Sequence, residues 1–158
     1  CFVVDSPQAL VNCDVRPPMQ TRFRFFGSYP LPWQGIRVSA TYRNDPGQDI
    51  VANWAAPLAS VQASLGRPLS GGLRTVTVPL IAPGALYNDR IHQVDFRLAK
   101  DFRLNRLTIQ PQFDLYNMLN GAYVLAQNNT YSPTGTTWQR PTSIMQGRLA
   151  KVGLQVTF

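Results

Sequence analysis

The sequence predicts an all-β protein, and three features support that class. Glutamate is absent and Lys100 and Lys151 are the only lysines, although both residue types are common in soluble surface helices. Thirteen prolines and eleven glycines interrupt helical windows. Five segments alternate apolar and polar residues with a period of two, as strands with two unlike faces do. No run approaches the roughly 18 consecutive apolar residues of a transmembrane helix.

The five candidate strands are residues 21–29, 35–43, 92–102, 106–117 and 149–158. In chain order, the predicted apolar faces hold Thr21, Phe23, Phe25 and Tyr29; Ile36, Val38, Ala40 and Tyr42; Val94, Phe96, Leu98 and Phe102; Leu107, Ile109, Phe113 and Leu115; and Ala150, Val152, Leu154, Val156 and Phe158. Valine, tyrosine and phenylalanine favour strands. Pro111 lacks a backbone donor in the middle of the fourth segment, which predicts a bulge there.

The opposite faces of these segments are charged. They carry Arg22, Arg24, Arg37, Arg43, Asp95, Arg97, Asp114 and Lys151. Alternation alone fits two folds. A soluble β-sandwich would turn these charges to water and bury the apolar side chains, whereas a membrane barrel would turn the apolar side chains to lipid and the charges to a wet lumen.

The connections between the segments differ in length. Short turns are expected around PLPWQG and around Leu104 and Asn105. The predicted organisation is an outer loop over 1–18, a hairpin over 19–47, an outer loop with strand extensions over 48–89, a hairpin over 90–119, an outer loop over 120–142 and a terminal strand over 143–158. Structureless loops of this length are uncommon in compact soluble domains. Short turns at one end and long loops at the other are typical of outer-membrane barrels.

Aromatic residues near the strand ends give a further argument for a barrel. Tyr29, Trp33, Tyr42, Phe102 and Phe158 would lie at a membrane interface, although in a soluble protein they would belong to the core. The last segment also runs to the final residue on its apolar face. We therefore expect an antiparallel transmembrane β-barrel segment of about five long strands, a fragment of a larger barrel.

Charge and cysteine content indicate the environment. The net charge of +7 would suit nucleic acid, but the arginines are scattered singly, so no nucleic-acid partner is predicted. Cys1 and Cys13 are a candidate disulfide that closes a small loop in an oxidising compartment; two free thiols are the alternative.

The sequence predicts neither an enzyme nor a metal or cofactor site. It has one histidine and no glutamate, and it lacks nucleophile motifs and metal-ligand spacings. Asp95 and Asp114 could act as paired acids, but salt bridging to Arg97 is the better interpretation. Three loop aromatics could stack on a ligand or pack the loops: Trp54, Tyr131 and Trp138.

Several motifs, in order along the whole chain, resemble the closing strands of TonB-dependent outer-membrane receptors, and most closely the Oar-like group. One pattern, R-x-x-Q-hydrophobic-D-x-R, is Arg90, Gln93, Val94, Asp95 and Arg97. The pattern F-D-x-Y-N-x-x-N is Phe113, Asp114, Tyr116, Asn117 and Asn120. Further matches are NNTY at 128–131, then Trp138, Pro141 and Ile144, and the short turn GSYPLPW at 27–33. The ending is similar to the signal that the barrel assembly machinery reads, through Lys151, Gly153, Val156 and Phe158.

The resemblance implies a location in the bacterial outer membrane, in contact with its lipid bilayer. It implies import of a bulky nutrient, such as a metal chelate, glycan or peptide. A complete receptor has about 22 strands, a plug and a segment that contacts the TonB complex, so we expect this chain to be a C-terminal fragment whose missing N-terminal regions supply them. If the last strand ends in the periplasm, the turn at Leu104 and Asn105 is periplasmic and the three long loops face outward.

Two contrasting expectations follow. The barrel requires detergent for solubility and loses assembly when Phe158 is deleted. The alternative, a soluble β-sandwich that binds carbohydrate or protein, is a water-soluble monomer with Phe158 buried.

Overall fold

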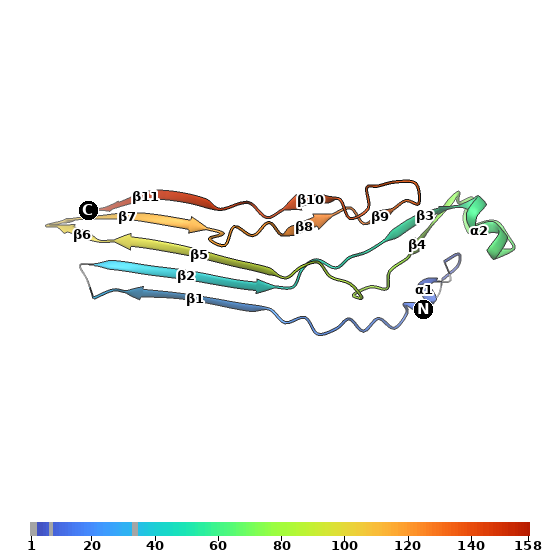
Figure 1. Cartoon of the computed structure of the whole chain (residues 1–158), viewed down its shortest axis with the longest axis horizontal. Coiled ribbons are helices and arrows are strands. Elements are labelled where there is room, and N and C mark those ends of the chain that lie inside the picture. Colours follow the sequence, from blue (N-terminus) through green and yellow to red (C-terminus); the bar gives the residue numbers. More distant parts are fainter. Residues whose placement is uncertain (1–2, 7, 33–34) are drawn as a thin grey trace. The chain divides into compact units, whose positions relative to one another are not determined.

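The computed structural model describes residues 3–6, 8–32 and 35–158 and is mostly β (Figure 1). The chain divides into two compact units. One comprises residues 1–20, 47–89 and 124–144, and the other comprises 21–46, 90–123 and 145–158. The sheets are antiparallel apart from one short parallel pair, and the described residues form no closed barrel.

The second unit holds a six-stranded antiparallel sheet, and its five long strands correspond to the five predicted segments. The long strands, in spatial order, are β1 (Phe23–Pro30), β2 (Ile36–Asp45), β5 (Ile91–Lys100), β7 (Leu107–Tyr116) and β11 (Leu149–Thr157). A short strand, β6 (Phe102–Leu104), also pairs with β7. The prediction of long antiparallel strands is therefore confirmed.

The register of this sheet gives it one apolar and one polar face. Residues directly opposite in an antiparallel pair point to the same side. Phe25 is opposite Tyr42 and Ala40 is opposite Phe96, while Phe113 is opposite both Leu98 and Val152. A register slip of one residue between two strands would place apolar and polar side chains on the same face. The observed register avoids this, so the apolar side chains of the five segments form one continuous surface.

The hairpin between β6 and β7 turns at Asn105 and Arg106, close to the predicted turn. Asn105 has a φ of 50°, a left-handed conformation that asparagine tolerates better than most residues.

The predicted bulge at Pro111 is wrong. Pro111 pairs in unbroken register with Leu154 of β11. On the other side of β7, the ladder to β5 ends at Gln112 and the ladder to β6 resumes at Ile109. The proline thus lies beside the break between β5 and β6, where no ladder partner is needed, and no extra residue has to be inserted.

The first unit contains two smaller sheets and short helical segments. In one sheet, β3 (Asn53–Pro57) pairs with β4 (Thr75–Pro79) and, in parallel, with β9 (Thr130–Tyr131). In the other, β8 (Val124–Gln127) pairs with β10 (Pro141–Ile144). The helical segments are α1 (Gln8–Val11), α2 (Leu58–Leu65) and η1 (Ser70–Gly72). Ala52, Ala56, Leu69 and Val78 are buried. Among the described residues, no helix is long and apolar enough to cross a membrane.

Gly47 lies against the backbone of the first unit, and we expect Gly47→Ala to destabilise the protein. A Cβ atom there would overlap the carbonyl oxygen of Asn88, and relieving that overlap should cost about 1 to 2 kcal/mol. At Gly27 the added Cβ would lie at an ordinary 3.6 Å from the Phe25 ring, so Gly27→Ala is the control. Chemical unfolding of the two variants should separate them, and equal stability would contradict the expected overlap.

Candidate functional site

The apolar face of the six-stranded sheet is exposed. Its exposed large side chains are Phe23, Phe25, Tyr29, Leu98, Phe113, Val152, Leu154 and Val156. Val152 is 80% exposed and Leu154 65% exposed. Contiguous apolar surfaces of this kind are rare on soluble monomers and mark contact with a protein or a membrane.

Aromatic and polar side chains lie at the two ends of this apolar face. At the end where β5 begins, the Tyr42 hydroxyl lies 3.1 Å from His92 Nδ1, and the rings of Phe23 and Tyr42 have centroids 6.1 Å apart. At the opposite end, Lys100 Nζ lies 4.7 Å from the centre of the Phe102 ring. Tyr29 lies near the end of β1, and Phe158 directly follows β11. Trp33 lies outside the described residues.

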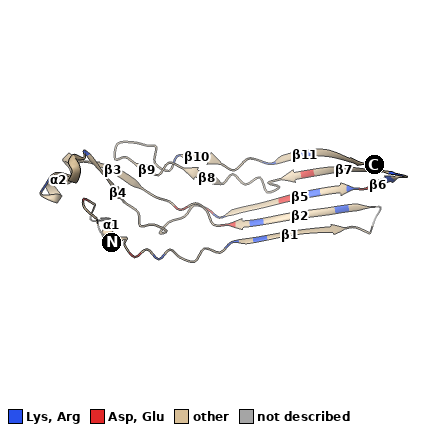
Figure 2. Ribbon diagram, turned by 180° about the vertical axis from the view of Figure 1, so that it is seen from behind, with Lys and Arg blue, Asp and Glu red and all other residues tan. Residues whose placement is uncertain are grey.

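The polar face gathers the predicted charged residues. By register, seven of them share this face: Arg24, Arg37, Arg43, Asp95, Arg97, Asp114 and Lys151. Arg22 directly precedes β1. Figure 2 shows charges on β1, β2, β5 and β7.

Arginine–aspartate ion pairs link neighbouring strands on the polar face. Arg24 and Arg43 lie 3.1 and 3.3 Å from the Asp45 carboxylate, and Arg37 lies 3.9 Å from Asp101. The Arg24 pair joins β1 to β2, and the Arg37 pair joins β2 to the residue between β5 and β6, whereas the Arg43 pair lies within β2.

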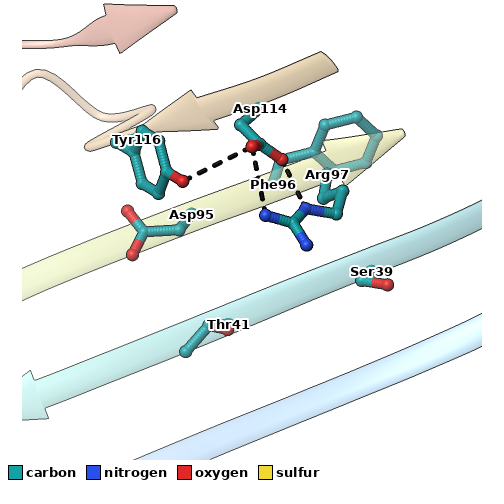
Figure 3. A pocket seen from close by; sticks show the side chains of 7 residues that line it. All are labelled: Ser39, Thr41, Asp95, Phe96, Arg97, Asp114 and Tyr116. Atoms are coloured by element: carbon teal, nitrogen blue, oxygen red, sulfur yellow. Dashed lines mark hydrogen bonds and ion pairs between the residues drawn. The ribbon is translucent and has the colours of Figure 1, made fainter. Parts of the chain in front are cut away.

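The ion pair with the most buried carboxylate on the polar face joins Arg97 of β5 to Asp114 of β7 (Figure 3). Arg97 Nε donates to Asp114 Oδ1, and Arg97 Nη2 donates to Oδ2 at 3.1 Å. The Tyr116 hydroxyl also donates to Oδ2 at 3.4 Å. On the other side of β7, Lys151 is directly opposite Asp114. Asp114 is only 2% exposed. Two-pronged hydrogen bonds between an arginine and a carboxylate are among the stronger ones in proteins.

Asp95 is held differently from Asp114. Its carboxylate accepts Gln93 Nε2 at 3.0 and 3.1 Å and the Asn117 backbone N–H at 2.8 Å. The two aspartates are therefore not arranged as a pair of acids, and Arg97 pairs with Asp114 alone.

Asn117 is a residue whose role the strand pattern did not predict. It is 3% exposed and has a φ of 48°. Its side-chain amide donates to the carbonyl oxygens of Gly121 and Gln146, and its Oδ1 accepts the Gly121 N–H. The position of an asparagine directly after a strand, where the chain must turn, was the available signal.

The polar face contains a half-open hollow of about 250 Å³ (Figure 3). It is lined by Ser39, Thr41, Asp95, Phe96, Arg97, Asp114 and Tyr116. The hollow brings together two carboxylates, one guanidinium and several hydroxyl groups. Its chemistry suits the binding of polar groups, and it offers no nucleophile activated by a neighbouring base.

The loop aromatics lie together in the first unit. Trp54 is the register partner of Tyr131 between β3 and β9, and the rings of Tyr131 and Trp138 meet edge to face at 5.8 Å. The indole N–H of Trp138 donates to the Val51 carbonyl at 3.0 Å. The Tyr131–Trp138 contact and this hydrogen bond have the character of loop packing.

The terminal signal residues lie on and directly after β11. Lys151 and Gly153 belong to the polar face and Val156 to the apolar face. A Cβ at Gly153 would lie 2.7 Å from Gln112 Nε2, so glycine there leaves room for the opposing glutamine. Phe158 is 99% exposed. The burial of Phe158 that a β-sandwich requires is therefore not present within this structure.

The predicted disulfide involves Cys1, which lies outside the described residues, so that pairing stays a prediction. Within ranges 3–6, 8–32 and 35–158, no three His, Cys, Asp or Glu side chains gather as a metal site.

The pH dependence of the first unit should reflect Asp5. Burial acts to raise the pKa of this carboxyl, but the Ser70 backbone N–H at 2.8 Å and Arg67 at 2.8 Å outweigh it and lower the pKa. Because the folded pKa lies below the unfolded value of about 3.9, the stabilisation exists above about pH 4 and is lost as the pH falls through the folded pKa. A carboxyl NMR titration should show this, and Arg67→Gln should move the Asp5 pKa upward; no movement would contradict the assigned cause.

Comparison of the chain with protein-family models, with curated proteins and with solved structures gave no match.

Proposed function

We propose that this chain is the C-terminal barrel portion of a TonB-dependent transporter that imports a bulky nutrient across the bacterial outer membrane. The sequence resemblance supports the receptor class. The main observation that supports a membrane position is the continuous, exposed apolar face opposite a charged face. Lipid would cover the first face and an aqueous lumen would solvate the second.

Strand length also supports a membrane position. The five strands contain 8, 10, 10, 10 and 9 residues. A tilted strand needs about 9 to 11 residues to cross the hydrocarbon layer, so four of these strands have the length that spanning requires and β1 is one residue shorter.

The two outer strands support membership of a larger barrel. Among the described residues, β1 pairs only with β2, and β11 pairs only with β7. At membrane depth, the backbone N–H and C=O groups on the outer edges of β1 and β11 would lack hydrogen-bond partners. Each such group costs roughly several kcal/mol. Additional strands from the rest of the longer protein would close the barrel on both sides.

A soluble β-sandwich needs a second layer over the apolar face, and the large side chains of that face are exposed instead. The two functions differ in what surrounds the Phe113 side chain. Lipid surrounds it in the barrel, and protein surrounds it in a sandwich.

Spin-labelled amino acids placed one at a time along β7, with the protein in lipid vesicles, provide the test. We expect labels at Phe113 and Leu115 to be relaxed by oxygen, which partitions into lipid, and labels at Gln110 and Gln112, on the polar face by register, to respond to a water-soluble nickel chelate. Thr77, exposed in the first unit, is the aqueous control. Labels at Phe113 and Leu115 that neither reagent reaches would indicate a buried core and overturn the proposal.

A further inference from the structure

Among the described residues, one carboxylate on the polar face has no ionic partner. Asp45, Asp101 and Asp114 each lie within 4.0 Å of an arginine side chain. Across the described part of the chain, no lysine or arginine lies within that distance of Asp95, which is held only by amide N–H groups. Its negative charge therefore remains available to a ligand.

The surroundings of Asp95 supply further acceptors. Figure 3 shows its carboxylate on β5, with Thr41 on β2 and Tyr116 on β7 to either side. The Tyr116 hydroxyl donates its proton to Asp114, which leaves its oxygen free to accept, and a threonine hydroxyl can also accept. One carboxylate and two hydroxyl oxygens thus line the same hollow.

The neighbouring Arg97 does not neutralise the negative charge of Asp95. Arg97 is committed to Asp114 through two hydrogen bonds. Two carboxylates and one guanidinium line the hollow, and Lys151 lies opposite Asp114, so both cations belong to the Asp114 side and leave the Asp95 charge to a ligand.

We infer that this hollow is a binding site for a primary ammonium group, anchored by Asp95 with Thr41 and Tyr116 as additional acceptors. An ammonium group is a compact cation with three donors, which matches three acceptors, and hydrogen bonds to a carboxylate are strengthened by charge. A planar guanidinium would instead require a two-pronged carboxylate, and Gln93 already contacts both Asp95 oxygens. The inference rests on the proposed function and deepens it, because it names the chemical group that the lumen-facing side of the sheet would bind.

The test titrates the full chain, folded in lipid or detergent, with n-butylammonium chloride while NMR follows the amides of the hollow. Tetramethylammonium chloride at equal ionic strength is the reference cation, since it has the charge but no N–H donor. We expect saturable shifts with butylammonium alone, and binding about tenfold weaker in Asp95→Asn. The matched control is Asp45→Asn, which makes the same change at an aspartate outside the hollow and should leave the affinity unchanged.

Two sources could provide the ammonium group, a small amine solute or a lysine side chain. The tripeptide Gly-Lys-Gly with both termini blocked, so that the lysine side chain is its only amine, distinguishes them. Tighter binding than butylammonium indicates a peptide lysine, and equal binding indicates a simple amine.

Equal responses to both cations, or an unchanged affinity in Asp95→Asn, would overturn the site. If Asp95→Asn does not fold, Thr41→Val carries the same test, because it removes an acceptor and leaves the hydrogen bonds to Asp95 intact. Failure of this site can be distinguished from failure of the proposed function. An alternating spin-label pattern without a response to amines would contradict the ammonium site alone. Labels at Phe113 and Leu115 that are buried in protein would contradict the membrane position.

Discussion

Replacement of Phe113 by arginine is expected to lower the free energy of unfolding in lipid vesicles by about 2 to 4 kcal/mol. Phe113 lies in the middle of the apolar face, directly opposite Leu98 and Val152. In the proposed membrane position, the arginine would carry its charge into the hydrocarbon layer. Urea unfolding of the vesicle-bound protein, followed by tryptophan fluorescence, measures the change.

The matched control is Gln112→Arg, at the adjacent residue on the polar face. Gln112 is opposite Gly153 and Ala99, so the new charge would enter a solvated surface already rich in arginine. We expect an effect below about 1 kcal/mol. If both variants lose the same stability, or if Phe113→Arg is neutral, the apolar face does not contact lipid.

The second large effect is expected at the ion pair between β5 and β7. Asp114→Leu should destabilise the protein by about 2 kcal/mol, because it leaves the Arg97 guanidinium without its carboxylate. This is below the value for a deeply buried pair. The Arg97 side chain is 48% exposed, so water screens part of the interaction.

Two further variants identify the cause of that loss. Asp14→Asn removes a comparable contact, the pair with Arg16, whose side chains are 73% and 85% exposed, and should change stability by less than about 0.5 kcal/mol. The double variant Arg97→Met with Asp114→Leu should recover part of the lost stability, because no unpaired charge remains. A double variant no better than Asp114→Leu alone would show that packing, and not charge, holds this position.

Local pattern was sufficient for the strands. Four of the five segments are single strands in the structure, and the third covers β5 and the start of β6, because alternation needs no information from elsewhere in the chain. The turn at Asn105 was predictable for the same reason, since a residue that tolerates positive φ follows a strand. The bulge predicted at Pro111 failed because a missing donor matters only where a neighbouring strand requires it, and β5 breaks beside it.

The sequence by itself determined the strands, their two unlike faces and the set of charges on one of them, because a period of two is a property of a single extended segment. Only the tertiary structure decided which partners meet. Arg97 and Asp95 are two apart on one strand, about 6.7 Å, whereas Asp114, 17 residues away, stands directly opposite Arg97 across the ladder, where side chains begin only about 5 Å apart. Strand register therefore selected Asp114 as the partner of Arg97 and, within the part of the chain that the structure describes, left Asp95 without an ionic partner.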